Sequence, residues 1–286
     1  MPTDDGRIIT LTADHAAGGL ALSVAAGWNQ TEADWKFLLD VGQPVGIEDG
    51  AGRLIATAMT LPQGADFGWI SMVLVDEAHR GQGLATGLLN SCLRTLKEAG
   101  LVAVLDATEF GEPVYRPLGF EAQSTYQRWA IHDTLRAEEL SQLKRVSQSV
   151  SLEPADEACI LQVDEIVFGG KRPLVLQNLL ERSSEFSAMT QAGDGFVLGR
   201  EGTRAWQIGP LSAATPEDGL ALLAHAIEHI GMPVFIDVCD TATQFISALK
   251  SVGFRPQRQF IRMAKMAKTI FGIPRNSYAL AGPELG

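Results

Sequence analysis

The sequence predicts an α/β protein made of two similar halves, each with a mixed central sheet flanked by helices. The length of 286 residues favours two domains. Short runs rich in Ile, Val and Thr alternate with longer runs of helical period. A buried strand that ends in an aspartate, followed by a helix and an apolar-Gly-Phe corner, occurs twice, from Asp106 to Phe120 and from Asp237 to Phe254. This repeat predicts a duplicated α/β unit.

The first half is expected to follow the order strand, two helices, three strands, helix, strand, short helix and strand. Thr31, with Asp34 three residues later, predicts a capping box at the start of the second helix. Glycines and prolines mark the turns. The expected elements are Ile8–Leu11, Ala13–Trp28, Thr31–Leu39, Val45–Glu48, Arg53–Thr60, Trp69–Val75, Gly83–Ala99, Leu101–Leu105, Glu112–Leu118 and Phe120–Ile131.

A charged segment with few apolar residues, HDTLRAEELSQLKRVS, separates the halves and predicts a linker, with a helix as one alternative. The second half is expected to hold helices at Pro154–Val167, Pro173–Ser183, Pro216–His229 and Ala242–Val252 and strands at Phe186–Thr190, Gly195–Arg200, Thr203–Ile208, Val234–Val238 and Phe254–Met263. The tail, FGIPRNSYALAGPELG, predicts a loop that packs across the domain junction. The predicted divisions are a catalytic domain at 1–131, the linker at 132–147, a second domain at 148–267 and the tail at 268–286.

Composition narrows the function classes. Hydrophobic content of 46% and charged content of 20% are ordinary for a soluble globular protein. No apolar run approaches the ~20 residues of a membrane helix, and the N-terminal MPTDDG lacks the order of a signal peptide, so we expect a cytoplasmic protein without a membrane partner. The net charge of −11 argues against nucleic-acid binding and weakly favours cationic amines. The three cysteines have no CxxC spacing and are expected to be reduced and buried.

The stretch LVDEAHRGQGLATGLL, from Leu74 to Leu89, carries the clearest chemical signal. A strand runs into a glycine-rich turn and then into a helix, whose first N–H groups have no partner within the helix. Gly81 and Gly83 let an anion approach the backbone, and Arg80 adds a positive charge suited to phosphate. The loop lacks both the GxGxxG spacing and the Lys-Ser/Thr of a P-loop, so a plain strand-to-helix turn is the alternative.

RGQGLA also resembles the (Q/R)xxGx(G/A) motif of the GCN5-related N-acetyltransferases (GNAT), and the element order over residues 8–131 fits that family. LDATEFGEPVYRPLGF resembles its later motif, in which a tyrosine precedes the Gly-Phe corner. The whole chain resembles a bacterial subgroup in which a degenerate acetyltransferase-like domain follows the active one. The resemblance implies acetyl-CoA as cosubstrate and no metal. The implied contacts are Val73, Leu74 and Val75 for the pantetheine arm, and Arg80, Gly81, Gln82, Gly83, Leu84 and Ala85 for the pyrophosphate.

For such an enzyme, a neutral amine is expected to attack the thioester directly, with a splayed strand end near Val73–Val75 supplying an N–H donor for the oxyanion. The leaving thiolate has a parent pKa of about 8.5, so a nearby phenol can protonate it. The resemblance assigns this role to Tyr115, and a core aromatic is the alternative. The general base stays open among Asp76, Glu77, Asp106 and water.

The acceptor is expected to be a small-molecule or peptide amine. In the family, the N-terminal helices and the central strand wall the acceptor pocket, which nominates Trp28, Trp35, Trp69 and Asp106; a core position is the alternative for each tryptophan. His225 and His229 lie four residues apart but lack further metal ligands, so they indicate a polar helix face. The oligomeric state is not predicted.

The second half departs from the motif. At the place of the RGQG turn it has TPEDG, Thr215 to Gly219, in which Glu217 and Asp218 would repel a diphosphate. One cofactor site per chain is therefore expected, with a structural role for the second half. The rival hypotheses are a non-catalytic sensor that binds CoA or a metabolite, and an acyltransferase that uses a longer acyl donor or an oxygen acceptor.

Overall fold

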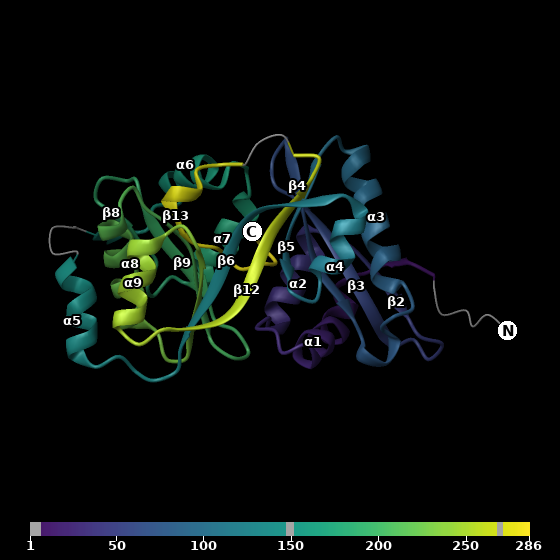
Figure 1. Cartoon of the computed structure of the whole chain (residues 1–286), viewed down its shortest axis with the longest axis horizontal. Coiled ribbons are helices and arrows are strands. Elements are labelled where there is room, and N and C mark those ends of the chain that lie inside the picture. The colour runs from purple at the N-terminus through teal and green to yellow at the C-terminus, as the bar shows by residue number, and fades with distance from the viewer. Residues whose placement is uncertain (1–6, 147–151, 268–270) are drawn as a thin grey trace.

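The computed structural model describes residues 7–146, 152–267 and 271–286, and it confirms the α/β class. Figure 1 shows two lobes, one for each half of the sequence, with two long strands crossing the middle of the molecule between them. The N-terminal segment MPTDDG, on which the expectation about a signal peptide rests, lies outside the described residues.

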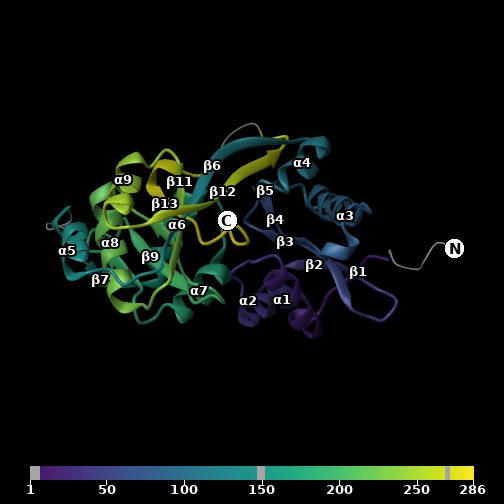
Figure 2. The ribbon, with the colours of Figure 1, turned by 60° about the horizontal axis from the view of Figure 1, so that its bottom comes forward.

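In the first lobe, two helical layers enclose the sheet. Helices α1 and α2 cover one face and α3 and α4 the other, as Figure 2 shows. The elements are β1 (Ile9–Thr10), a 3-10 turn η1 (Ala13–His15), α1 (Ala16–Ala25), α2 (Glu32–Val41), β2 (Gln43–Glu48), β3 (Leu54–Pro62), β4 (Phe67–Val75), η2 (Glu77–His79), α3 (Leu84–Glu98), β5 (Val102–Thr108), α4 (Glu112–Tyr115), η3 (Arg116–Leu118) and β6 (Phe120–Ile131). The predicted capping box is present, because the Thr31 side chain accepts from Asp34 N and the Asp34 side chain accepts from Thr31 N.

The second lobe repeats this order. Its elements are α5 (Ala137–Val146), β7 (Leu152–Pro154), α6 (Glu157–Phe168), α7 (Pro173–Arg182), β8 (Ala188–Thr190), β9 (Phe196–Arg200), β10 (Trp206–Ser212), α8 (Pro216–His229), β11 (Val234–Cys239), α9 (Thr243–Ser251), β12 (Arg255–Lys265), η4 (Pro274–Asn276) and β13 (Ser277–Ala279). Two short strands, β7 and β13, were not predicted: the sequence analysis began a helix at Pro154, the last residue of β7, and assigned the region of β13 to a loop. The linker segment contains α5, which is the helical alternative, and its Leu143 is buried in the core of the second lobe.

The two halves exchange their last strands. The sheet runs β1-β2-β3-β4-β5-β12-β6-β11-β10-β9-β8-β7, so β12 lies between β5 and β6, while β6 lies between β12 and β11. Both exchanged strands are antiparallel to their neighbours. Each lobe therefore contains one strand from the other half of the sequence, and one sheet continues through the whole molecule (Figure 1).

Ion pairs fix both exchanged strands at equivalent places. Asp106 on β5 accepts two hydrogen bonds of 2.9 Å from Arg262 on β12. Asp237 on β11 accepts two of 2.7 Å from Arg128 on β6. The aspartates that mark the repeat in the sequence thus hold the strand donated by the opposite half.

The tail packs across the junction between the lobes, as predicted, but part of it is a strand rather than a loop. Trp69 Nε1 donates to Pro283 O at 2.9 Å, and Gln63 Nε2 donates to Leu285 O at 3.2 Å. On the other side, the Arg172 guanidinium donates to Leu285 O at 3.1 Å. The tail therefore ties α7 of the second lobe to the sheet of the first.

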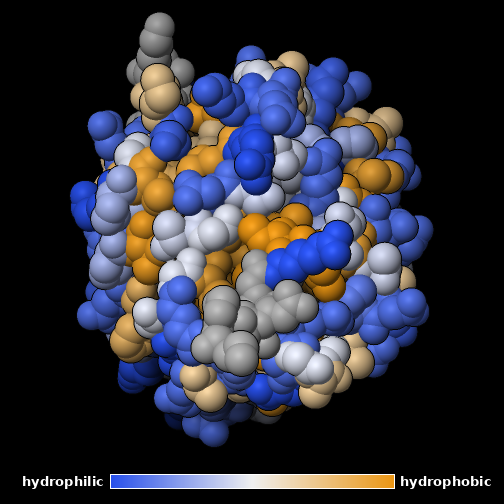
Figure 3. Space-filling model, turned by 90° about the vertical axis from the view of Figure 1, so that its right-hand side faces the viewer, coloured by the Kyte–Doolittle hydropathy of each residue, from blue (hydrophilic) through white to orange (hydrophobic). Residues whose placement is uncertain are grey.

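The surface at the outer end of the first lobe carries mainly hydrophilic side chains, with apolar ones between them (Figure 3). Across the ranges that the structure describes, no helix combines the length and the apolar character needed to cross a membrane.

Candidate active site

The strands β4 and β5 separate part of the way along their length. They pair in parallel only from Phe67–Trp69 to Val102–Val104; beyond that, β4 stays with β3 and β5 stays with β12. Met72 has φ of 52° where β4 bulges, and its carbonyl accepts a 2.7 Å hydrogen bond from Thr57 Oγ1. The splay expected near Val73–Val75 is therefore present.

The glycine-rich loop lies at the end of β4. Gly81 and Gly83 have φ of 76° and 80°, in the left-handed region that favours glycine. A Cβ atom at either position would meet no protein atom within 4 Å, so both face open space. Gly83 is the N-cap of α3 and provides no side-chain cap, which leaves the first N–H groups of the helix without that partner. Arg80 is exposed beside them, and its Nε donates to Val75 O at 3.3 Å.

One cleft of about 1110 Å³ joins the splay to this loop. The geometry suits a long ligand with an anionic end, because free backbone donors and a guanidinium lie at one end and an opened strand pair continues from them. Gln82 does not line the cleft and is exposed on the loop. The other predicted cofactor residues all line it: Val73, Leu74, Val75, Arg80, Gly81, Gly83, Leu84 and Ala85.

Tyr115 also lines the cleft, across from β4. It lies on α4 with its ring centroid 6.0 Å from that of Phe120, so it is both a core aromatic and a cleft residue. Its hydroxyl has no hydrogen-bond partner among the residues that the structure describes. Burial raises the pKa of Tyr115 above its ordinary value, with a smaller contribution from the Cys92 thiol. The proton therefore stays on the hydroxyl at neutral pH.

The candidate general bases differ in the hydrogen bonds that engage their carboxylates and in their pKa. The hydrogen bond from His79 Nδ1 to Asp76 Oδ1, 2.9 Å long, lowers the pKa of Asp76, which makes it a weak base. Burial raises the pKa of Asp106 against the opposing attraction of Arg262, and both carboxylate oxygens of Asp106 are engaged by that guanidinium. Glu77 lines the cleft and is exposed.

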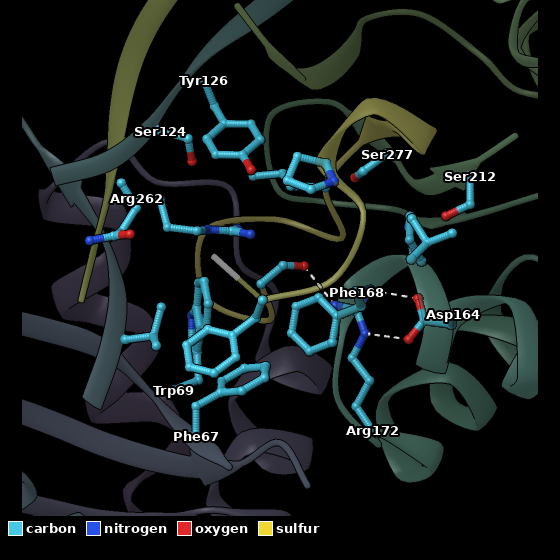
Figure 4. A pocket seen from close by; sticks show the side chains of 18 of the residues that line it. Phe67, Trp69, Ser124, Tyr126, Asp164, Phe168, Arg172, Ser212, Arg262 and Ser277 are labelled. Atoms are coloured by element: carbon cyan, nitrogen blue, oxygen red, sulfur yellow. Dashed lines mark hydrogen bonds and ion pairs between the residues drawn. The ribbon is translucent and has the colours of Figure 1, made fainter. Parts of the chain in front are cut away.

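The tryptophans divide between the cleft and the core. Trp28 lines the cleft, whereas Trp35 is fully buried and donates from Nε1 to Ser23 Oγ at 2.9 Å. Trp69 is 1% exposed and lines a separate, small cavity of about 40 Å³ at the junction of the lobes. Figure 4 shows that cavity, in which the Arg262 guanidinium lies over the Trp69 ring, 4.6 Å from its centroid.

Many residues that line the cleft were not candidates in the sequence analysis, among them Gln30, Ser71, Arg258 and Glu284. Gln30 and Ser71 are each 5% exposed, and their side-chain oxygens have no hydrogen-bond partner among the residues that the structure describes. Arg258 lies on the exchanged strand β12, and Glu284 lies in the tail, where it pairs with Arg200. A polar residue beside a predicted strand end could have drawn attention to Ser71, but nothing local in the sequence places residues 258 and 284 in the first lobe.

The corresponding splay in the second lobe is filled by the chain itself. Strands β10 and β11 pair in parallel only from Trp206–Ile208 to Val234–Ile236. Beyond that point β13 pairs with β10, and Leu280 N donates to Asp237 O at 3.0 Å. Tyr278 packs beside Gly219 near the start of α8. The place that would correspond to a second cofactor site is thus occupied by the tail, in addition to the acidic residues of TPEDG.

Comparison with known proteins identifies both lobes. Residues 22–120 match the family model described as "Acetyltransferase (GNAT) family", and residues 160–278 match a second one, "Acetyltransferase (GNAT) domain". The chain is a tandem GNAT protein. The family resemblance read from RGQGLA is confirmed, and the second match shows that the duplication is of a whole GNAT unit.

Among curated proteins, the tandem GNAT protein resembles YhbS of Escherichia coli K12, described as an uncharacterized N-acetyltransferase. The two are 37% identical over 90 residues, which cover 28% of this chain and 52% of YhbS. The chain thus spans about half the length of the curated relative that it matches.

Solved structures show the same fold over the whole chain. A structure of an acetyltransferase candidate from Pyrococcus horikoshii superposes with a TM-score of 0.81 at 17% identity, covering 100% of this chain and 98% of that one. A tandem GNAT protein from the clavulanic acid biosynthesis pathway gives 0.61 at 14% identity, covering 90% and 97%. A GCN5-related N-acetyltransferase from Sphaerobacter thermophilus gives 0.64 at 13% identity, covering 91% and 95%. At these identities the likeness establishes the fold alone.

Proposed function

We propose that this tandem GNAT protein is an N-acetyltransferase that moves an acetyl group from acetyl-CoA directly to an amine. One observation carries the proposal: the β4–β5 splay, the loop of Gly81 and Gly83, and Tyr115 share one cleft in the first lobe. In the second lobe, β13 pairs with β10 where the corresponding splay would open.

In this proposal the loop holds the diphosphate of acetyl-CoA. The N–H groups at the start of α3 and the Arg80 guanidinium offset its charge. The pantetheine arm extends along Val73–Val75, where β4 no longer pairs with β5, so that backbone donors there can stabilise the oxyanion of the tetrahedral intermediate.

The incoming ammonium first loses a proton to Glu77 or to water, and the neutral amine then attacks the thioester carbon. The C–S bond breaks as Tyr115 gives its proton to the departing thiolate, and the proton that the acylated nitrogen sheds restores the phenol, directly or through water. Asp106 is held by Arg262, so it serves to fix β12 in the first lobe rather than to carry protons. In keeping with the composition, the proposed setting is the cytoplasm.

The test is a panel of small amines and lysine peptides with acetyl-CoA, with released thiol as the readout and the Gly83→Asp protein as the control. Thiol release that needs both the amine and an intact loop supports the proposal. Binding of CoA without thiol release from any amine would instead identify a sensor. Faster release from a longer acyl-CoA would correct the donor, and transfer to hydroxyl compounds would correct the acceptor.

A further inference from the structure

Two rows of side chains cross the exchanged strands, and they differ at one position. In the first lobe, Asp106, Arg262 and Ser124 lie side by side on β5, β12 and β6. In the second lobe the equivalent row on β11, β6 and β12 consists of Asp237, Arg128 and Arg258. The first row is neutral, whereas the second has one carboxylate for two guanidinium groups.

The Asp237 carboxylate is already committed to Arg128. Its Oδ1 accepts from Arg128 Nε and its Oδ2 from Arg128 Nη2, both at 2.7 Å, and Oδ2 also accepts from Gln207 Nε2 at 3.1 Å. Burial lowers the pKa of Arg258, as do the nearby positive charges of Arg128 and Arg204. Arg258 is therefore a partly buried guanidinium among like charges, and it makes no ion pair with any residue that the structure describes.

Arg258 lines the same cleft as the glycine-rich loop of the first lobe. Its neighbour Arg204 donates from Nη1 to Gly27 O at 2.6 Å and from its backbone N to Asn29 Oδ1 at 3.0 Å. The segment between α1 and α2, which includes Trp28, forms the adjoining wall. Two other charged residues of the cleft have counter-ions, since Glu284 pairs with Arg200 and Arg128 with Asp237.

The same cleft holds two buried oxygens that need hydrogen-bond donors. Gln30 lies in the segment between α1 and α2, and Ser71 lies on β4 just beyond Trp69, the last residue that pairs with β5. The side-chain oxygen of each has no partner among the residues that the structure describes. Leaving such a group without a partner is unfavourable, and a ligand N–H can supply the missing hydrogen bond. An amine placed near these oxygens would lie beside the stretch of β4 where the acetyl group is expected.

We infer that the acceptor is an amine that also carries an anionic group, a carboxylate or a phosphate, which Arg258 binds. This inference rests on the proposed function and names its substrate class. The acceptor pocket is then shared between the halves, because the amine contacts residues of the first half while the anion contacts a strand of the second. Arg258 becomes the residue that determines specificity, and the hint toward cationic acceptors from the net charge of −11 does not extend to this pocket.

The experiment uses matched pairs of acceptors with acetyl-CoA and the full-length protein. One arm compares an α-amino acid with its decarboxylated amine, and the other compares an aminoalkyl phosphate with its amino alcohol. We expect the anionic member of at least one pair to have a kcat/KM roughly 10-fold or more above its partner, the size of a charge-assisted hydrogen bond. The arm with the larger ratio identifies the anion as carboxylate or phosphate.

Arg258→Gln should lower kcat/KM for the member that carries the anionic group by about 10-fold to 100-fold. It should leave kcat/KM for the member without that group within roughly 2-fold of the wild-type value. Arg255→Gln is the matched control, because Arg255 is exposed on the same strand and does not line the cleft. It should change neither member. Equal rates within every pair, or an equal loss for both members in Arg258→Gln, would overturn the inference while the proposed function stands.

If the wider amine panel releases thiol and no anionic member of a pair does, the inference is refuted while the proposed function stands. If neither these pairs nor the wider panel releases thiol, the proposed function fails, and calorimetry with the CoA-bound protein decides the inference separately. Binding of an anionic amine that Arg258→Gln abolishes and Arg255→Gln preserves supports it. Binding that does not depend on Arg258, or no binding of any anionic member, refutes it.

Discussion

The two splays of the tandem protein have the same geometry but different occupants. In each lobe, three residues of one central strand pair in parallel with three of the next before the strands separate. The first gap opens into a cleft that ends on a glycine-rich loop. The second contains β13, a strand of the protein's own tail, and Tyr278 near the start of α8. The duplication thus preserved the splay in both lobes, while the first splay opens into a cleft and the second pairs with a strand of the tail.

The loops that precede α3 and α8 also differ in helix capping and in charge. Gly83 opens α3 without a side-chain cap, whereas Thr215 caps α8 by accepting from Asp218 N at 3.2 Å. The cap satisfies one of the free N–H groups at the start of α8, and the carboxylates of Glu217 and Asp218 disfavour an anion there. Burial raises the pKa of Tyr278 to about 12, with smaller contributions from the nearby Glu217 and Asp218 carboxylates.

Substitutions in the two loops should give the largest difference in CoA affinity between the lobes. Gly83→Asp adds a side chain where φ is 80° and a negative charge where the diphosphate is expected, so CoA affinity should fall by about 1000-fold or more. Glu217→Gln should leave it unchanged. Calorimetric titration with CoA should give one site per chain in the wild type. Two equivalent sites, or CoA binding that survives Gly83→Asp, would contradict the assignment of a single cofactor site to the first lobe.

The ion pairs of the exchanged strands should behave alike in both lobes. Asp237→Ala leaves Arg128 buried without its counter-ion and should cost about 3–5 kcal/mol of unfolding free energy, as for other broken buried pairs. Asp106→Ala should cost somewhat less, because the Arg262 side chain is 16% exposed and that of Arg128 only 8%. Denaturant titration measures both, with the exposed Asp133→Ala as control. A loss below about 1 kcal/mol for either variant would show that the pair does not hold its strand.

Tyr115 should mark the catalytic lobe kinetically. Tyr115→Phe removes the hydroxyl and keeps the packing against Phe120, so kcat should drop by roughly 100-fold while CoA affinity stays the same. Tyr278→Phe, the equivalent change at the filled splay, should leave kcat unaltered. Steady-state kinetics with calorimetry separates the two effects. An unchanged kcat in correctly folded Tyr115→Phe would remove the phenol from the mechanism.

The smallest expected effect is the absence of an alkaline limb. Burial raises the pKa of Tyr115 above its ordinary value of about 10, so the protonated form persists to higher pH than in a free phenol. Activity should therefore rise with pH as the amine acceptor loses its proton and should not fall again below about pH 10. A kcat/KM profile from pH 6 to 10 checks this. A decline already at about pH 8.5 would assign the acid to a different group, such as a thiol.

The sequence predicted the elements well because the period of each is local. The capping box at Thr31 and the helix Pro216–His229 were found with their exact partners or bounds. The glycine loop was found because Gly81 and Gly83 adopt a backbone that other residues avoid. The strand exchange was missed, since β12 shows the same alternation whichever sheet it joins. For the same reason Arg258 and Glu284 could not be assigned to the cleft. The sequence also could not show that Trp28 lines the cleft while Trp69 lines the separate cavity at the junction of the lobes.

The exchange of β6 and β12 sets the order in which this protein can be made. In the finished sheet β12 lies between β5 and β6. Neither β5 nor β6 can therefore pair with β12 until residue 265 has been synthesised, after nearly all of the second half has been translated. Such long-range pairing closes late and slows folding. It also makes the protein indivisible: a fragment ending near residue 131 would leave one edge of β5 and both edges of β6 unpaired, and its cleft would lack the wall that residues 257–261 provide.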